Sequence, residues 1–453
     1  MIVMKFGGTS VANNEAISRT IEIIRTKLDE KPVVVVSALS KVTDLLYKIA
    51  DSAALKDKKA SAEYLEQLRE RHINLCRELI TNDETLLNDA ISRVETLCSE
   101  LEYIVVAVCA LGELSDRSKS IIIAFGEYLS SNIISCAMNA RGIKTRLMNS
   151  REMIITNTEH MKAEPIVPEI EARVPGIVAA AFEGMEAVIT QGFVSATTTG
   201  EPTVLGRGGS DYTASLIGMA IDAERIEIWT DVDGVKTADP RKVKGTLSLD
   251  KLSFEEAAEM AHFGAKVLHP LTIEPAVKKN IPLYVLNSMN PEGKGTAILQ
   301  SKFIEDGVKS VSFKENIIVI NIFSTKMINA SGFLKKVFGI FSEHKVSVDL
   351  IATSEANISV TVDGSQKNID AVVETLSKFA QVELDTDKAQ VSVIGKNIAN
   401  IKGMLKEIFA PMDNHRVYMI SQGASYINVS FVVDKADMDN VVQSIHDLLF
   451  YGK

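Results

Sequence analysis

A six-residue segment with three glycines, one cation and one carboxylate has the composition of an anion-binding loop. Residues 206–211 read GRGGSD and lead directly into a helical pattern that starts at Tyr212. Closely spaced glycines let bare backbone N–H groups approach the oxygens of a ligand, and a helix N-terminus favours negative charge there. A plain surface turn would rarely also need Arg207 and Asp211. The spacing fits neither the dinucleotide fingerprint G-x-G-x-x-G nor the P-loop, so the familiar nucleotide folds are disfavoured.

A second glycine pair follows a short apolar run at the start of the chain. Residues 1–6 predict a buried strand, Gly7-Gly8 predicts a turn, and residues 11–28 predict a helix. Lys5 leads directly into this turn, which is a geometry that presents amides to phosphate. Gly-Gly after a strand is commonly only a turn, so this pair is weak evidence alone. The existence of two such loops favours the phosphate-binding interpretation.

The composition describes a globular protein of two or three domains. The chain has 453 residues, of which 46% are hydrophobic and 24% charged, and its formal net charge is −10. An acidic protein is a poor partner for nucleic acid or an anionic membrane, since both require a basic surface. We therefore expect this protein to bind neither nucleic acid nor membranes. An acidic substrate must therefore be held by local cations such as Lys5 and Arg207.

The sequence predicts a cytoplasmic protein without a metal centre. Apolar runs such as residues 104–111 are shorter than a membrane helix needs, and the N-terminus does not resemble a signal peptide. The four cysteines show no C-x-x-C pairing, so buried free thiols are expected. His262 and His269 lack a metal-binding pattern such as H-E-x-x-H and are interpreted as structural.

The first 300 residues alternate strands and helices. Apolar segments at 33–37, 187–191, 225–230 and 281–286 predict strands of a mostly parallel sheet, with helices between them. Residues from about 55 to 105 are charged and helix-periodic without strand signals, which predicts a helical insertion. The segment 291–295, PEGKG, ends this pattern. We therefore place a domain boundary near residue 300.

The C-terminal third contains a repeat. Strands at 317–323, 346–351 and 357–362 with helices at 332–343 and 369–378 form one series, and residues 390–449 repeat it with a helix at 398–409. Two small ferredoxin-like units are the simplest account, at 301–386 and 387–453, with 307–314 a candidate first strand of the second. Such pairs often bind small ligands in their seam, although packing or dimerisation is the alternative.

Six segments, taken together and in order, resemble aspartate kinase. They are KFGGTS at 5–10, Phe125-Gly126-Glu127, read as a turn, GRGGSD at 206–211, WTDVDG at 229–234, DPR at 239–241 and FGAKVLHP at 263–270. Residues 332–334 and 348–355 are similar to the regulatory ACT domains of that family. The resemblance covers essentially the whole chain. It implies an amino-acid-kinase three-layer α/β sandwich, with a mostly parallel central sheet, and two ACT units.

The resemblance implies transfer of the γ-phosphoryl group of ATP to the side-chain carboxylate of aspartate. This reaction opens lysine, threonine and methionine biosynthesis. Because a carboxylate with a reference pKa near 4 is already ionised at neutral pH, no general base is required. The site must instead supply positioning and positive charge. Magnesium would be held mainly by phosphates and water, so no metal-binding residue is predicted.

The resemblance also assigns residues to the catalytic site. Lys5 and Lys266 would be its cations, oriented by Asp211. The residues implied in ATP binding are Lys5, Phe6, Gly7, Gly8, Thr230, Asp231, Lys236, Arg241, Lys266 and Val267. Lys236 departs from the tyrosine that is common at its position. Arg207 would bind the α-carboxylate of aspartate and Glu127 its α-ammonium, within a pocket completed by Ser37, Thr43, Gly208, Gly209 and Ser210.

The first ACT unit is implied to bind an amino-acid effector, and lysine is favoured. The matching residues are Met327, Gly332, Phe333, Asp349, Ser354 and Glu355, whereas Asn329 replaces the histidine of some lysine-inhibited relatives. A homodimer or homotetramer assembled through the ACT units is expected. Two alternatives stay open: another amino acid kinase that shares the phosphate loops, and a catalytically idle amino-acid sensor. The intact Lys5, Asp211 and Lys266 disfavour the idle sensor.

Overall fold

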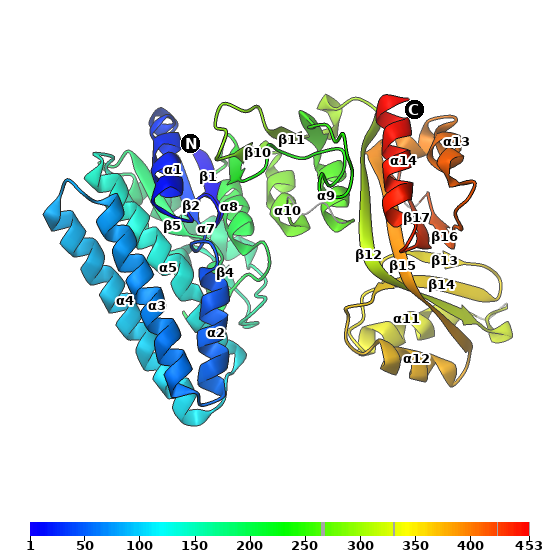
Figure 1. Cartoon of the computed structure of the whole chain (residues 1–453), viewed down its shortest axis with the longest axis horizontal. Helices are drawn as coiled ribbons and strands as arrows, with labels where there is room; N and C mark the ends of the chain where they lie inside the picture. The colour runs from blue at the N-terminus through cyan, green and yellow to red at the C-terminus, as the bar shows by residue number, and fades with distance from the viewer. Residues whose placement is uncertain (264–267, 329–330, 424, 453) are drawn as a thin grey trace. The chain divides into compact units, whose positions relative to one another are not determined.

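The computed structural model describes residues 1–263, 268–328, 331–423 and 425–452. The chain contains two compact units (Figure 1). Unit 1 contains Met1–Val235 and Val267–Gln300, and unit 2 contains Lys236–Lys266 and Ser301–Lys453. Unit 1 thus ends at the residue where we placed the domain boundary. The segment Lys236–Lys266, which the sequence pattern grouped with the α/β region, clusters with the C-terminal residues instead.

Unit 1 is built on a mostly parallel sheet with the strand order β3-β5-β2-β1-β8-β10-β11. Every neighbouring pair from β3 to β10 is parallel, and β11 runs antiparallel to β10. Runs of β-branched residues such as Val33–Val36 are buried on both faces, as a doubly covered sheet requires. The strands are β1 (Ile2–Phe6), β2 (Pro32–Val36), β3 (Thr145–Met148), β5 (Ala187–Gln191), β8 (Ile226–Thr230), β10 (Leu283–Asn287) and β11 (Thr296–Leu299).

Helices cover both faces of this sheet, which gives three layers. Met4 and Phe6 of β1 join a core with α1, α2 and α5, whereas Val3 faces Gly218 of α8. The predicted α/β sandwich is therefore confirmed. The helices are α1 (Asn14–Arg25), α2 (Val42–Ala54), α5 (Asp116–Ala140), α6 (Ser150–Met153), α7 (Val167–Ala181), α8 (Gly209–Ala220) and α10 (Pro270–Lys279). A small separate sheet contains β4 (Ile155–Thr156), β6 (Val194–Thr197) and β7 (Pro202–Val204).

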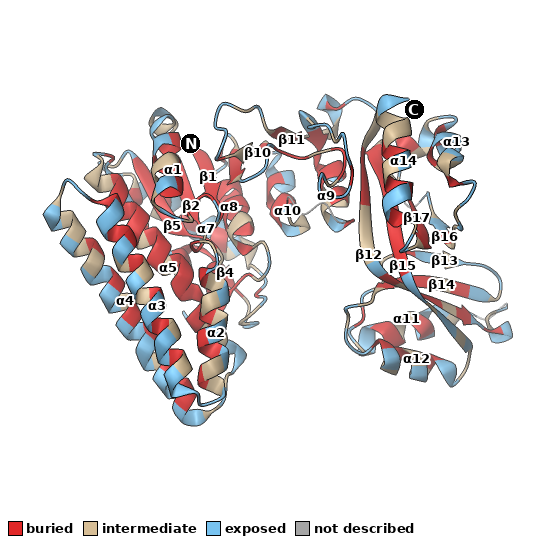
Figure 2. Cartoon of the chain, in the orientation of Figure 1, coloured by how far each residue is buried: buried red, intermediate tan, exposed pale blue. Residues whose placement is uncertain are grey.

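A long helical hairpin extends from unit 1 and packs against α5 (Figure 1). It consists of α3 (Lys58–Leu79) and α4 (Glu84–Leu111), and it contributes Leu68, Val94 and Leu101 to the core. This is the predicted insertion, which continues to residue 111. The four cysteines lie buried in the same core. Helix α5 is long and apolar enough to cross a membrane by composition, but 83% of its most apolar window is buried inside the protein (Figure 2).

We expected the segment Phe125-Gly126-Glu127 to form a turn, and this prediction was wrong. The segment lies in the middle of α5. Glycine is required here by packing, since a Cβ at Gly126 would come within 2.7 Å of the Cβ of Ala38. The missing side chain lets α5 approach the loop after β2. The glycine signal therefore marks a close approach between two elements rather than a chain reversal.

Unit 2 contains an antiparallel sheet with the order β13-β14-β12-β15-β17-β16. Two long strands run through both ferredoxin-like units. Residues 317–323 of β12 pair with β14, and residues 307–314 pair only with 390–396 of β15. The two predicted ferredoxin-like units thus share one continuous sheet. The strands are β12 (Gly307–Phe323), β13 (Ile351–Thr353), β14 (Asn357–Asp363), β15 (Gln381–Lys396), β16 (Met419–Ser421) and β17 (Asn428–Asp434).

Four helices of unit 2 complete two small cores, one in each half of the sheet. They are α11 (Phe333–Glu343), α12 (Ile369–Ser377), α13 (Met404–Phe409) and α14 (Met438–Tyr451). The short strand β9 (Lys251–Ser253) and helix α9 (Phe254–His262) also belong to unit 2. Single 3₁₀ turns span Leu28–Glu30, Ser301–Phe303, Thr325–Met327, Ile398–Asn400 and Ala410–Met412.

For two elements of the repeat, the predicted first residue was wrong. The predicted strand at 346–351 begins only at Ile351, because Lys345 adopts a left-handed conformation and residue 346 closes the end of α11 by bonding to Phe341. The predicted helix at 398–409 begins at Met404, because Gly403 has a positive φ of 88° and interrupts it. Apolar periodicity does not reveal either left-handed residue.

Candidate active site

The chemistry-bearing loops of unit 1 meet at the carboxyl edge of the parallel sheet. The aligned register pairs Phe6 of β1 with Val36 of β2 and with Trp229 of β8, so the loops that follow these strands begin side by side. This edge is where parallel α/β sheets bind ligands. The two predicted glycine loops are thus brought to one place, although they are about two hundred residues apart in sequence.

Lys5 and Asp211 form the central contact of this edge. The Nζ atom of Lys5 lies 2.5 Å from Oδ1 of Asp211, and their side chains are only 10% and 16% exposed. The contact is an ion pair rather than an aligned hydrogen bond. The Lys5 ammonium also lies 3.5 Å from the position that a Cβ of Gly7 would occupy. A partly desolvated cation therefore sits against the first glycine turn.

The second glycine loop forms the N-terminus of α8. Gly206 and Gly208 have φ values of 78° and 71°, which explains why glycine is needed at both positions. Gly209 and Ser210 begin the helix. The amide of Gly209 donates to the carbonyl of Gly206 at 3.0 Å, whereas the amides of Ser210 and Asp211 have no partners within the helix. Together with the helix dipole, these amides favour an anion at this position.

A turn that we did not predict supports this helix N-terminus. Phe193, between β5 and β6, has a φ of 65°, and its N–H donates to the hydroxyl of Thr213 on α8. That hydroxyl in turn donates to the carbonyl of Gly209. A Cβ at Gly192 would lie 2.5 Å from the Cβ of Ser210. The signal available in sequence was a Gly-Phe pair directly after a buried strand.

Glu127 projects from α5 toward the same loops. The amide of Ala38 donates to its Oε1 at 3.2 Å, whereas its buried Oε2 has no hydrogen-bond partner among the residues that the structure describes. The carbonyl of Ala38 lies 3.1 Å from the position of a Cβ on Gly8. Burial raises the pKa of Glu127 to about 8, against a smaller opposing effect from the charge of Lys5. The unpaired Oε2 is suited to accept a hydrogen bond from a cationic ligand.

Arg207 and His269 lie on either side of Gly208. The Cβ of His269 is 2.7 Å from the position of a Cβ on Gly208, while Arg207 is exposed. The ring of His269 caps α10 by accepting from the amide of Leu271. Burial, followed by the charge of Arg207, lowers the pKa of His269. Its proximity to the loop was not predicted, because we interpreted this histidine as structural.

The remaining predicted residues of unit 1 lie at the ends of the same strands. Ser37 directly follows β2 and its amide donates to Phe6, while Thr43 lies in the first turn of α2. Thr230 ends β8, and its hydroxyl donates to Asp231, which is exposed. These side chains therefore surround the edge that carries Lys5.

Four predicted residues do not belong to the described part of unit 1. Lys236 and Arg241 are in unit 2, where Lys236 forms a bridge with Ser248 and exposed Arg241 pairs with Asp239 at 2.6 Å. Lys266 and Val267 lie outside the described residues, as does Asn329. Their assignments stay predictions.

The predicted effector residues are distributed around the first half of the unit 2 sheet. Gly332 is the N-cap of α11 with a φ of 88°, and Asp349 precedes β13. Asp349 is paired with Lys314 at 2.6 Å. Ser354 and Glu355 are exposed in the turn between β13 and β14, and Met327 and Phe333 are partly buried.

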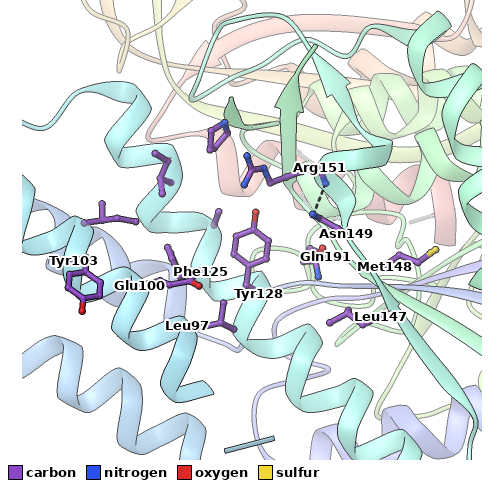
Figure 3. Close-up of a pocket in the computed structure, with 14 residues that line it drawn as sticks. Leu97, Glu100, Tyr103, Phe125, Tyr128, Leu147, Met148, Asn149, Arg151 and Gln191 are labelled. Atoms are coloured by element: carbon purple, nitrogen blue, oxygen red, sulfur yellow. Dashed lines mark hydrogen bonds between the residues drawn. The ribbon is translucent and has the colours of Figure 1, made fainter. Parts of the chain in front are cut away.

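A separate pocket of about 690 Å³ lies between α4, α5 and β3 (Figure 3). The hydroxyl of Tyr128 points toward the guanidinium of Arg151 in this pocket. Leu97, Phe125 and Leu147 form part of its apolar wall. None of the predicted site residues that the structure describes lines it. Among the residues that the structure describes, no group of three metal-ligating side chains is found.

Comparisons with known proteins agree with this architecture. The model of the amino acid kinase family matches residues 1–287, and the ACT domain model matches 320–378 and 391–449. Aspartokinase 1 of Arabidopsis thaliana, a chloroplastic protein, is 37% identical over 99% of this chain and 80% of its own length. Lysine-sensitive aspartokinase 3 of Escherichia coli is 34% identical over 99% of both chains.

Solved structures show the same likeness in three dimensions. Aspartokinase III of E. coli in complex with aspartate and ADP has a TM-score of 0.86 and 32% identity, covering 99% of this chain and 100% of that chain. The complex of the same enzyme with lysine and aspartate has a TM-score of 0.81, 32% identity and 99% coverage of both chains. The chain thus belongs to the amino acid kinase family and, within it, to the aspartokinases with C-terminal ACT domains.

Proposed function

We propose that this protein is an ATP-dependent aspartate kinase that produces 4-phospho-L-aspartate and ADP. The observation that carries the proposal is the Lys5–Asp211 ion pair, which lies where two glycine loops meet at the carboxyl edge of the sheet. Membership of the aspartokinases supports the same reaction, and the E. coli relative was solved with aspartate and ADP.

The nucleophile is the side-chain carboxylate of aspartate. It is ionised at neutral pH, so one of its oxygens attacks the γ-phosphorus and the bond from phosphorus to the bridging oxygen of ADP breaks. No proton is transferred in this step. The protein must hold the two reactants in line and balance the charge on the transferring group.

Lys5 supplies that positive charge. Its ammonium is partly desolvated and is fixed by Asp211, so it keeps one orientation before and during transfer. The Gly7-Gly8 turn would bind the β- and γ-phosphates beside it, with the amide of Gly7 already donating to the carbonyl of Trp229 at 3.1 Å. Thr230 and Asp231, at the end of β8, would contact the nucleotide, together with Lys236, Arg241, Lys266 and Val267 as predicted.

Glu127 and Arg207 would select an amino acid. The unpaired Oε2 of Glu127 supports a contact with the α-ammonium of aspartate, which would compensate the burial of this carboxylate. Arg207 at the start of α8 would bind the α-carboxylate through its planar guanidinium. Gly208, Gly209 and Ser210 would complete the pocket with Ser37 and Thr43.

We further propose that Mg²⁺ accompanies ATP and is bound through phosphate oxygens and water. Asp211 is the carboxylate beside the phosphate loop, and its pairing with Lys5 suits a site in which the nucleotide supplies most ligands. When bound, the ion would neutralise part of the phosphate charge. The ACT units are proposed to bind an amino-acid effector, with lysine favoured, and to assemble a homodimer or homotetramer.

Trapping of the acyl phosphate tests the proposed reaction. The purified protein is incubated with ATP, Mg²⁺ and hydroxylamine, with either aspartate or glutamate as acceptor. We expect a hydroxamate from aspartate only. A hydroxamate from glutamate alone would indicate a different amino acid kinase, and no hydroxamate from either acceptor would indicate an idle sensor.

A further inference from the structure

The carboxylate predicted to bind the effector already has a cationic partner inside the chain. Nζ of Lys314, on β12, lies 2.6 Å from Oδ2 of Asp349. The Lys314 side chain is 24% exposed and the Asp349 side chain only 8%. An ammonium ion of an effector that binds Oδ2 of Asp349 must therefore compete with the ammonium of Lys314.

A buried carboxylate requires such a partner whenever the effector is absent. Removing a charged group from water is costly unless an opposite charge or hydrogen bonds compensate. The other oxygen of Asp349, Oδ1, faces Nε2 of His262 at 3.9 Å, which is too long for a hydrogen bond. Among the residues that the structure describes, Lys314 is thus the group that compensates Asp349.

Lys314 also has a second carboxylate within reach. Its Nζ lies 3.7 Å from Oδ2 of Asp363, at the end of β14, and the Asp363 side chain is 32% exposed. Ser365 donates two hydrogen bonds to the other oxygen of Asp363, so this carboxylate is held in place. A small rotation of the Lys314 side chain would move its ammonium from the carboxylate of Asp349 to that of Asp363. Two acidic groups therefore share one ammonium, which leaves the cluster with an excess of negative charge.

We propose that Lys314 is an internal competitor that sets the affinity of the effector site. In the absence of effector, Lys314 forms an ion pair with Asp349. An ammonium of the effector displaces it, and Lys314 then pairs with Asp363. This inference rests on the proposed role of Asp349 in effector binding. Lys314 lowers the affinity of the site for the effector, so that inhibition begins only at a higher effector concentration.

Substitutions of Lys314 test the competition by their sign. Lys314→Met keeps the length of the side chain but leaves Asp349 without its cation, so lysine should bind about tenfold more tightly. Lys314→Arg should weaken lysine binding, because a guanidinium binds a carboxylate with two parallel hydrogen bonds. Isothermal titration calorimetry with lysine on the full chain measures both. The lysine concentration that halves kinase activity should shift in the same directions.

Asp363 and a second ion pair provide the controls. Asp363→Asn removes the alternative partner, so it should weaken lysine binding in the original chain and have no effect in the Lys314→Met variant. Lys388 and Asp434 form a similar pair at 2.9 Å in the other half of the sheet. Lys388→Met should therefore leave lysine affinity unchanged.

The outcomes separate this inference from the proposed effector site. Unchanged or weaker lysine binding by Lys314→Met would overturn the competition. If that variant does not fold, tighter or unchanged binding by Lys314→Arg, or no effect of Asp363→Asn, would overturn it as well. Lysine binding that survives Asp349→Asn would instead show that the effector contacts another place, and the proposed site would fail together with the inference.

Discussion

Two lysine–aspartate pairs of similar burial lie in the two units of this protein, and they are expected to do opposite things. Lys5 and Asp211 are 10% and 16% exposed, and Lys314 and Asp349 are 24% and 8% exposed. The ammonium–carboxylate distances are 2.5 and 2.6 Å. The pair itself therefore does not determine the ligand.

The groups around each ion pair determine which ligand is favoured. Next to Lys5 and Asp211 stand the N-terminus of α8 and the Gly7-Gly8 turn, so positive potential prevails and phosphate is favoured. Next to Lys314 and Asp349 stands a second carboxylate, Asp363, so negative potential prevails and a cation is favoured. An ion pair thus acts as a neutral centre, and its neighbours decide which sign of ligand is bound.

Substitution of Lys5 should have the largest effect. Lys5→Met removes the cation next to the transferring phosphoryl group, and kcat should fall by about 10³-fold or more. Lys388→Met, which removes a cation of unit 2, should leave kcat unchanged. Steady-state measurement of ADP release compares the two. Comparable kcat values for both variants would show that the charge of Lys5 has no specific role in phosphoryl transfer.

Substitution of the two aspartates should separate catalysis from regulation. Asp211→Asn releases Lys5 from its fixed position, and kcat should fall by about 10²-fold while lysine affinity is retained. Asp349→Asn should abolish lysine inhibition while the activity without lysine is retained. Kinetics and calorimetry on both variants test this. If either variant altered both properties equally, the two pairs would not have separate roles.

The close contact behind the α8 loop predicts an intermediate effect. In Gly192→Ala the new Cβ would lie 2.5 Å from the Cβ of Ser210, so the loop must shift. We expect kcat/KM for aspartate to fall by roughly 30-fold, since small displacements of binding groups are costly. Gly176→Ala has open space around its Cβ and is the matched control. Equal kcat/KM values in the two variants would show that the contact does not position the loop.

The buried Glu127 predicts the smallest effect, a pH dependence. Its pKa is raised to about 8 by burial, so the free protein holds it mostly protonated at pH 7. The α-ammonium of aspartate requires the carboxylate form. KM for aspartate should therefore fall about tenfold between pH 7 and 9, and binding should release a proton.

The same pKa predicts a trend in stability. A carboxyl group whose pKa is raised by folding is favoured in its protonated form, so stability without aspartate should decrease as pH rises from about 4.5 to 8. Glu127→Gln should remove both pH dependences, as measured by kinetics and thermal unfolding. Persistence of the KM profile in this variant would assign it to another group.

Much of the fold was predictable because its signals are local. The buried run Ala187–Gln191 matched β5 to the residue. What periodicity could not show was conformation at single residues. Lys345 and Gly403 in left-handed geometry shortened two predicted elements.

The site was predictable through its residue types but not through its supports. Lys5, Asp211 and Glu127 are charged residues close to glycines in the sequence, and the fold brings them to one edge of the sheet. The supports depend on contacts between distant segments, such as Gly192 against Ser210 and Phe193 against Thr213. The Lys314–Asp349 pair joins residues 35 positions apart, and no motif marks it.

The most direct test of the central claim follows an oxygen atom. Aspartate labelled with ¹⁸O in its side-chain carboxylate is incubated with the protein, ATP and hydroxylamine. Because the carboxylate attacks phosphorus and hydroxylamine later attacks the carbonyl carbon, the released phosphate should carry one ¹⁸O atom, detected by mass spectrometry or ³¹P NMR. Phosphate without ¹⁸O, produced at the same rate as ADP, would show that water rather than aspartate accepts the phosphoryl group.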